Sequence, residues 1–414
     1  MTPNPPQKRR DLRIILHGDA IWTQSGYAVE LDWIIRRLMK EGFQVAQATK
    51  AGLSTHWIDY KMDEGVLRMY PSVDDPHGSD TLFYGARHFN AHLAISMIDI
   101  WVIQPQYIQE LKKLGVKYWG YIPIDSDPIS PLVLNKLPFL DKIVTFSDFG
   151  QKTLTKHGFA SEMIYEGVDT NQLIPRNKVE ARKKYGIPQD NFYWGMIAAN
   201  KESPPRKGWQ EALQAFKIFY DKHPEAAIFM QTQQISPGNF PIMEYANYLK
   251  IQHRIFSLDQ LFSTVLGTRD DIVLMHNCFD ALLHPSQTEG FGLTPVEAQS
   301  CGIPAVVNGC HSQPELVIEG VTGAIAKPKE DNKRWTMMGS YWEPADPIAV
   351  YEGMEKVYAM VKQDPKKVAF DCRKHVKETF NIDKIFSERW LPLIESLQEK
   401  LPPQLTPPAE TLII

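Results

Sequence analysis

The segment 287–304, QTEGFGLTPVEAQSCGIP, sets two glutamates around a glycine turn. Glu289 precedes Gly290 and Gly292, and Glu297 follows them where a helix is expected to begin. Glycines let a backbone approach a ligand closely, and a helix N-terminus offers free N–H groups with partial positive charge, so a diphosphate would fit there. The carboxylates then need another task, and glutamate can accept paired hydrogen bonds from vicinal diols. A diphosphate with a sugar at each end is a nucleotide sugar.

A purely structural role explains part of the same segment. Thr294 would be a good N-cap, Pro295 suits the first helical position and Glu297 stands at the third, which is the pattern of a capping box. The two glycines could form only a tight turn. Glu289 has no such structural explanation, so it is the sharper of the two acidic candidates.

A second loop offers the cations that a diphosphate needs. The segment IAANKESPPRKGW follows a strand pattern, precedes a helical one, and holds Arg206 and Lys207 side by side before Gly208. Such a pair can neutralise a diphosphate leaving group. A solvated surface pair explains the same residues equally well. A third, weaker candidate is WTQSGYAVE, where Gly26 lies between the first strand and the first helix, and where Ser25 could be only an N-cap.

These loops need strands and helices to position them, and the chain has the pattern for both. The run LRIILHGD reads as a buried strand, a helical stretch ending near Gly42 follows it, and FQVAQAT reads as the next strand. Further strand candidates are IDIWVIQP, KYWGYIPID, KIVTFSD, FYWGMIAAN, AAIFMQT, FDALLHPS and PAVVNG. The sum is two α/β domains with parallel sheets, whose strand-to-helix loops would line a cleft between them.

Composition excludes several classes of protein. The chain has 414 residues, too many for one ordinary core, and its net charge of −4 argues against a basic nucleic-acid binder. The cysteines lack zinc-site spacing, and we expect reduced, mostly buried thiols: Cys278, Cys301, Cys310 and Cys372. No apolar run approaches about 20 residues, so no membrane span is expected, and because no apolar run follows the polar N-terminus, no signal sequence is expected there. We expect a cytoplasmic protein.

The residues resemble those of a known family. TEGFGLTPVEAQSCGIPAVV is similar to the E-x7-E segment of retaining glycosyltransferases of the GT-B fold, most like glycosyltransferase family 4 (glycosyl transferases group 1). Further similar stretches are FDALLHPSQTEGFG, VVNGCHSQPELVIEGVTGAIAKP, AAN…RKGW and VTFSDFGQKTLTKHGF. The resemblance is strong over 143–328 and thinner over 12–142.

The resemblance implies roles for the donor loop. Glu289 matches the family's first glutamate, which contacts the donor sugar near the reacting centre, and Glu297 matches the second, which binds the ribose hydroxyls. The loop backbone that holds sugar and phosphate corresponds to Gly290, Phe291, Gly292 and Leu293.

The same resemblance implies the residues that contact the phosphates, and this chain differs from the family's pattern at two positions. Arg206 and Lys207 match the cations on the diphosphate, and Gly26 matches a glycine near the phosphates. Asn200 stands closest to the place where many members carry an arginine, which leaves the diphosphate more dependent on Arg206 and Lys207. Asp125 stands where many members have a sugar-contacting histidine, and a turn residue explains it as well. Tyr27 and Ser25 are weaker candidates for an acceptor or sugar contact.

The resemblance also implies an architecture. It is α/β, of GT-B type, with two Rossmann-like domains facing a central cleft and a C-terminal helix crossing back to the first domain. We expect five parts: a disordered N-terminus (1–10), an acceptor domain (11–187), a nucleotide-sugar donor domain (188–375), C-terminal helices packing back on the first domain (376–401), and a flexible Pro-rich tail (402–414).

The implied activity is transfer of a hexosyl or pentosyl group from a nucleotide-diphosphate sugar to an acceptor hydroxyl, with retention and without metal or cofactor. We expect a UDP- or GDP-sugar as donor. The acceptor stays open among glycan, lipid and small molecule. The alternatives are transfer to modified nucleic-acid bases, a GT-B-like nucleotide-sugar epimerase and a non-catalytic sugar-nucleotide binder. No stable nucleic-acid binding is expected, while a peripheral membrane contact and the oligomeric state stay open.

Overall fold

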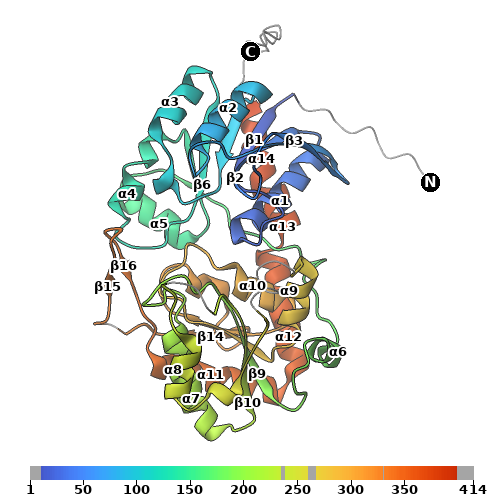
Figure 1. Ribbon diagram of the computed structural model, residues 1–414, viewed down its shortest axis with the longest axis vertical. Helices are drawn as coiled ribbons and strands as arrows, with labels where there is room; N and C mark the ends of the chain where they lie inside the picture. The colour runs from blue at the N-terminus through green and yellow to red at the C-terminus, as the bar shows by residue number, and fades with distance from the viewer. Residues whose placement is uncertain (1–10, 235–237, 260–266, 330, 399–414) are drawn as a thin grey trace, which may run out of the picture. The chain divides into compact units, whose positions relative to one another are not determined.

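The computed structural model describes residues 11–234, 238–259, 267–329 and 331–398. The predicted disordered N-terminus (1–10) and flexible tail (402–414) lie outside these residues. The described chain forms two compact units (Figure 1). Unit 1 takes residues 11–122, 133–145 and 383–398, and unit 2 takes 123–132 and 146–382. Residues 146–187, which the sequence pattern assigned to the N-terminal domain, lie in unit 2.

Unit 1 is built on a largely parallel sheet whose strands run in the order β3-β4-β2-β1-β5-β6-β7. The strands are β1 (Arg13–Asp19), β2 (Gln44–Ala51), β3 (Ile58–Met62), β4 (Gly65–Tyr70), β5 (Leu93–Ser96), β6 (Lys117–Ile122) and β7 (Lys142–Thr145). The helices are α1 (Gly26–Lys40), α2 (Ser79–Phe89), η1 (Ile100–Val102), α3 (Pro105–Lys113), η2 (Leu137–Phe139), η6 (Phe386–Trp390) and α14 (Leu391–Gln398). Two short helices, α4 (Pro131–Leu134) and α13 (Ile382–Ile385), each contain a point where the chain passes from unit 2 to unit 1.

The C-terminal residues 383–398 belong to unit 1, whereas residues 376–382, which the resemblance grouped with them, lie in unit 2. The buried ring of Trp390 meets Tyr121 of β6 edge-on, with ring centroids 4.9 Å apart. Arg37 of α1 adds an ion pair to Asp383, with its Nη2 2.7 Å from Oδ1. The helix that precedes these residues, α12 (Pro365–Thr379), ends at Thr379.

One strand prediction in unit 1 is wrong. The run IDIWVIQP holds the turn η1 rather than a strand, and the sheet instead uses the preceding residues Leu93–Ser96 as β5. Its isoleucines are buried all the same, Ile98 fully and Ile100 and Ile103 nearly so. A short apolar run reports burial, and periodicity alone cannot say whether a buried segment is a strand.

Unit 2 has a parallel sheet in the order β11-β10-β9-β12-β13-β14. The strands of this sheet are β9 (Phe192–Ile197), β10 (Ala226–Gln231), β11 (Ile255–Ser257), β12 (Ala281–His284), β13 (Ala305–Asn308) and β14 (Gly323–Ala326). Unit 2 also holds the short strands β8 (Glu162–Met163), β15 (Arg334–Trp335) and β16 (Tyr341–Trp342), which are not part of this sheet. Its helices are α5 (Asp148–Lys156), α6 (Lys178–Lys184), α7 (Trp209–Lys222), α8 (Ile242–Tyr248), η3 (Gln252–Arg254), α9 (Arg269–His276), α10 (Leu293–Ser300), η5 (Gln313–Leu316), α11 (Pro347–Gln363) and α12 (Pro365–Thr379).

Helices cover this sheet in two groups. α7 packs against α8 and α11, α10 packs against α9 and α12, and Figure 1 draws the two groups on different sides of the strands. Because both faces are covered, the central strands are apolar throughout, as AAIFM in β10 and AVV in β13 are. The sheet therefore rests in an apolar core, and its polar loops lie at the strand ends. The short antiparallel pair β15–β16 stands apart from it.

Two further expectations can be compared with this structure. All four cysteines are free and buried, as predicted. Within the described ranges, none of the helices has the length and apolar character needed to cross a membrane.

Candidate functional site

Two loops of unit 2 meet where adjacent parallel strands end. β9 pairs with β12, so the loop after each strand leaves the same edge of the sheet. The backbone N–H of Gln287 donates to Arg206 O at 2.8 Å, which joins the two loops directly. Gly208 permits this approach, since an added Cβ would lie 2.0 Å from the carbonyl oxygen of Pro285. The predicted cation loop and the predicted glutamate loop thus form one site.

Glu289 is the centre of a buried charge cluster in this site. Its side chain is only 10% exposed, and its Oε1 accepts a hydrogen bond from Lys207 Nζ. Arg206 Nη1 lies 3.6 Å from the other carboxylate oxygen. His284, the last residue of β12, brings its Nε2 to 3.4 Å from Oε1. One carboxylate therefore faces two cations and an imidazole.

The cluster shifts the pKa values of its members. Burial alone would raise the pKa of the Glu289 carboxyl, but the charge on Lys207, with His284 and Arg206, outweighs burial and holds that pKa well below its ordinary value. Burial, and then the charge on Arg206, lowers the pKa of Lys207. Burial likewise lowers the pKa of His284, which is therefore neutral at pH 7.

Arg206 is oriented by the backbone as well as by charge. Its Nη1 donates to Thr288 O at 2.9 Å, and its Nε lies 3.8 Å from Glu202 Oε1. With 29% of its side chain exposed, it remains accessible to a ligand. A cation held in place but reachable is suited to an incoming phosphate.

Glu297 has a different setting from the one predicted. α10 begins at Leu293 with Gly292 as its N-cap, so Thr294 lies inside the helix and the capping-box prediction is wrong. The chain turns at Gly292 with φ 114°, a conformation that favours glycine, and this starts the helix earlier than the Thr-Pro pair suggested. Glu297 instead lies 3.5 Å from Nε2 of the buried His276. It is free of a capping role.

Residues 177–336, which contain this charge cluster, match the family described as "Glycosyl transferases group 1". This match agrees with the resemblance and covers less than half of the chain. Among curated proteins, the D-inositol 3-phosphate glycosyltransferase of Mycolicibacterium gilvum is 28% identical over 187 residues, which are 45% of this chain and 40% of that protein. The "Uncharacterized 41.2 kDa protein in cps region" of Klebsiella pneumoniae is 42% identical over 62 residues, 15% of this chain and 17% of its own. The first match thus spans two fifths of that relative's length.

Solved structures resemble the whole described fold. Sucrose-phosphate synthase from Thermosynechococcus elongatus aligns with a TM-score of 0.72 and 14% identity, over 94% of this chain and 100% of that one. Anabaena HepE in complex with UDP-glucose aligns with a TM-score of 0.69 and 15% identity, over the same shares. At such low identity these likenesses show the fold alone, and the predicted α/β GT-B fold is confirmed.

Within the matched residues 177–336, the glycine loop (residues 290–292) packs closely against its neighbours. An added Cβ on Gly290 would lie 2.3 Å from Pro123 Cβ, so only glycine fits there. Phe291 is buried, with its ring centroid 5.9 Å from Tyr165 and 5.6 Å from Phe380. Its side chain anchors the loop in the core of unit 2.

Two other candidates of unit 2 use their polar groups within the protein. The buried Asn200 donates to Phe240 O at 2.9 Å and accepts from Phe240 N at 3.1 Å, which fixes the loop before α8. Asp125 accepts a hydrogen bond at its backbone oxygen from Thr288 Oγ1 and so adjoins the glutamate loop. Asn200 is thus occupied structurally, while Asp125 lies next to the charge cluster.

The remaining candidates belong to unit 1. Ser25 caps α1 by accepting from Ala28 N at 3.1 Å, as the alternative interpretation predicted, and its hydroxyl donates to Asp19 Oδ2 at 2.6 Å. Gly26 is the first residue of α1. Tyr27 donates through its hydroxyl to Asp99 Oδ1 at 3.0 Å.

A buried network that the sequence did not reveal supports the charge cluster from below. Glu211 of α7 accepts from Gln287 Nε2 at 3.2 Å and lies 3.5 Å from Nη2 of Arg334. Arg334 also donates to Gln287 Oε1 at 3.3 Å. These residues tie β15 to both loops of the site. Their separation of more than 40 positions along the chain gives no spacing signal, so only the fold brings them together.

Sequence reasoning also missed two histidines. His284 is hidden at the end of an apolar strand pattern, where a lone polar residue carries no signal. His311 follows β13 and has φ 54°, a left-handed conformation that costs a non-glycine residue free energy and often marks a functional position. Burial lowers the pKa of His311 to about 4.

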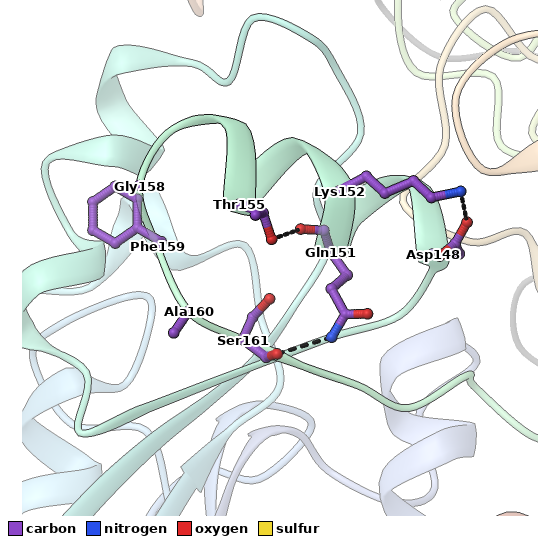
Figure 2. A pocket seen from close by; sticks show the side chains of 8 residues that line it. All are labelled: Asp148, Gln151, Lys152, Thr155, Gly158, Phe159, Ala160 and Ser161. Atoms are coloured by element: carbon purple, nitrogen blue, oxygen red, sulfur yellow. Dashed lines mark hydrogen bonds and ion pairs between the residues drawn. The ribbon is translucent and has the colours of Figure 1, made fainter.

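A surface cavity of about 710 Å³ lies elsewhere, along α5 (Figure 2). It is lined by Asp148, Gln151, Lys152, Thr155, Gly158, Phe159, Ala160 and Ser161. Lys152 forms an ion pair with Asp148, and Gln151 donates to the backbone oxygen of Ser161 at 2.9 Å. None of the predicted site residues lines it.

Proposed function

We propose that this chain is a glycosyltransferase that moves a sugar from a nucleoside-diphosphate sugar to an acceptor hydroxyl, with retention of anomeric configuration. The observation that carries the proposal is the burial of Glu289 against Lys207 and Arg206 at the ends of two adjacent parallel strands. Parallel α/β sheets bind ligands at this edge. The group 1 match over residues 177–336 supports the same assignment.

Each charged residue receives a role in the transfer. Arg206 and Lys207 stabilise the negative charge that develops on the diphosphate as the glycosidic bond to phosphate breaks. Glu289 accepts hydrogen bonds from hydroxyls of the transferred sugar, and Glu297 accepts them from the ribose. The backbone from Gly290 to Leu293 lines the phosphates at the start of α10.

Two further parts of the proposal are the need for a metal ion and the identity of the donor. Because two cations and a helix N-terminus face the diphosphate, we propose that transfer needs no metal ion. A solved structure of HepE, which shares the fold, is a complex with UDP-glucose, and this favours a UDP-sugar donor. The similar D-inositol 3-phosphate glycosyltransferases favour a polyhydroxylated small molecule or glycan as acceptor. Asn200, Asp125, Gly26, Tyr27 and Ser25 stay predicted contacts, and a cytoplasmic location stays a prediction.

A donor screen with a matched variant pair tests the proposal. UDP-, GDP- and ADP-glucose are added to the protein, and we expect one of them to raise the melting temperature. Lys207→Ala should abolish the shift, whereas Lys201→Ala, an exposed lysine of the same loop, should keep it. With an accepted sugar, NMR of the product should show the donor's anomeric configuration. No shift with any of the three nucleotides would contradict the proposal, and an inverted product would contradict retention.

A further inference from the structure

One buried group of the charge cluster has no task in the proposed transfer. His284 is 5% exposed and ends β12 directly beneath the glycine loop. Its Nε2 lies 3.4 Å from Glu289 Oε1, which is long for a hydrogen bond, and no other partner among the described residues reaches this atom. An added Cβ on Gly292 would lie 3.4 Å from the same nitrogen. A buried polar nitrogen without a close partner needs an explanation.

The charges around Glu289 explain why a histidine with an unpaired nitrogen lies here. In the free protein, Lys207 donates to Glu289 and so satisfies it. Under the proposed function, Lys207 must also neutralise a diphosphate, which carries one negative charge on each phosphate. A single ammonium cannot fully serve both, and a buried carboxylate that loses its cation is strongly destabilised. Arg206, at 3.6 Å from Glu289 and 3.8 Å from Glu202, is already shared.

We propose that His284 is a positioning residue that holds Glu289 when a diphosphate draws Lys207 away, taking up one proton from solvent as the ligand binds. This rests on the proposed function. Nε2 of the resulting imidazolium donates to Glu289 Oε1, and the carboxylate stays in place for the hydroxyls of the donor sugar. The exchange keeps the cluster electrically balanced: the ligand brings negative charge, and the proton offsets part of it.

Ligand binding changes the charges that face His284 in the direction of proton uptake. In the free protein, burial and the nearby charges on Lys207 and Arg206 keep the imidazole neutral, while Glu289 opposes them. Binding adds negative phosphates and withdraws Lys207 from Glu289, and both changes raise the pKa of His284. His311 is a second buried histidine within the electrostatic influence of Glu289, so it is the necessary control.

The linkage between proton uptake and ligand binding gives the sign of the pH dependence of affinity. The complex binds one more proton than the free protein, so affinity for the diphosphate rises as pH falls between the pKa of His284 in the complex and its lower pKa in the free protein. A nucleotide sugar is the right probe because its diphosphate is a diester and does not itself titrate near neutrality.

Isothermal titration calorimetry near pH 7 measures the proton directly. Whichever of UDP-, GDP- and ADP-glucose binds is titrated in Pipes, Hepes and Tris, and the dependence of the observed enthalpy on buffer ionisation enthalpy gives the protons taken up. We expect an uptake approaching one proton for the wild-type protein. His284→Gln should bind without uptake and lose the pH dependence of affinity, and His311→Asn, which tolerates a left-handed backbone, should keep both.

The outcomes separate this inference from the proposed function. Failure of the wild-type protein to bind any of the three nucleotides would overturn the proposed function and this inference with it. Binding without proton uptake would overturn this inference alone, and that measurement needs no variant to fold. Uptake that persists in His284→Gln, or that disappears in His311→Asn, would also overturn the assignment to His284.

Discussion

Removing Glu289 should cost the protein stability as well as activity. The sequence offered no structural role for Glu289, but its carboxylate is buried against Lys207, with side-chain exposures of 10% for Glu289 and 18% for Lys207. Deleting it leaves a buried ammonium without its partner. Breaking a buried pair in this way costs about 3–5 kcal/mol, and the residual exposure of Lys207 places the expectation near the lower end, at about 3 kcal/mol.

A double-mutant cycle isolates this effect. Lys207→Ala should cost less, about 1–2 kcal/mol, because Arg206 and His284 still face Glu289 at 3.6 and 3.4 Å. The double variant removes both charges, so we expect it to be more stable than Glu289→Ala alone. The predicted coupling is about 2 kcal/mol.

Thermal melting in the absence of nucleotide measures the coupling. At about 2–4 °C per kcal/mol for a domain of this size, the summed losses in melting temperature of the two single variants should exceed the loss of the double variant by about 4–8 °C. Because the chain has two compact units, the transition assigned to unit 2 is the one to compare. Strictly additive shifts of the single variants would refute the reasoning, since they would mean that the pair is not coupled in solution.

Three further predictions follow from single contacts. Gly208→Ala should lower donor affinity at least about tenfold and lower the melting temperature, because a Cβ placed 2.0 Å from Pro285 O forces the two loops apart; wild-type values for both would contradict the shared site. Thr294→Ala should keep the melting temperature within about 1 °C of the wild-type value, since Thr294 does not cap α10. Glu297→Gln should weaken nucleotide binding, measured by calorimetry, more than it lowers stability. A large loss of stability in both variants with unchanged nucleotide binding would instead support the capping box. Burial lowers the pKa of His17 to about 4, so stability should be complete above about pH 6.5 and fall as pH drops toward 4, and His17→Asn should reduce that slope in urea titrations; an unchanged slope would contradict the assignment.

The structure reverses the expected structural roles of the two glutamates in the segment 287–304. Glu297 looked compromised by a capping role, and Glu289 looked free of structural duty. The N-cap at Gly292 releases Glu297, while Lys207 ties Glu289 into the fold. Glu297 is therefore the cleaner probe of ligand binding, and Glu289 needs the double variant to separate binding from stability.

The sequence by itself determined most of the architecture and the loops that carry the site. Apolar strand runs alternating with amphipathic helices specify parallel sheets, because only strands covered on both faces can be apolar throughout. Glycines and paired cations at strand ends marked both loops of the site. The failures came where a local pattern has two readings: IDIWVIQP is buried without being a strand, and Thr-x-x-Glu forms no cap because a left-handed glycine starts the helix earlier.

Only the tertiary structure decided which residues share the site. The pairing of β9 with β12 brings Lys207 to Glu289 across 82 positions of the chain. The same packing places His284 beneath that pair and Arg334 beside Gln287. Such contacts depend on strand order and on the closeness of two backbones, as at Gly208 against Pro285, and no spacing along the chain encodes them. Burial then sets the pKa values, since the same side chains in water would titrate near their ordinary values.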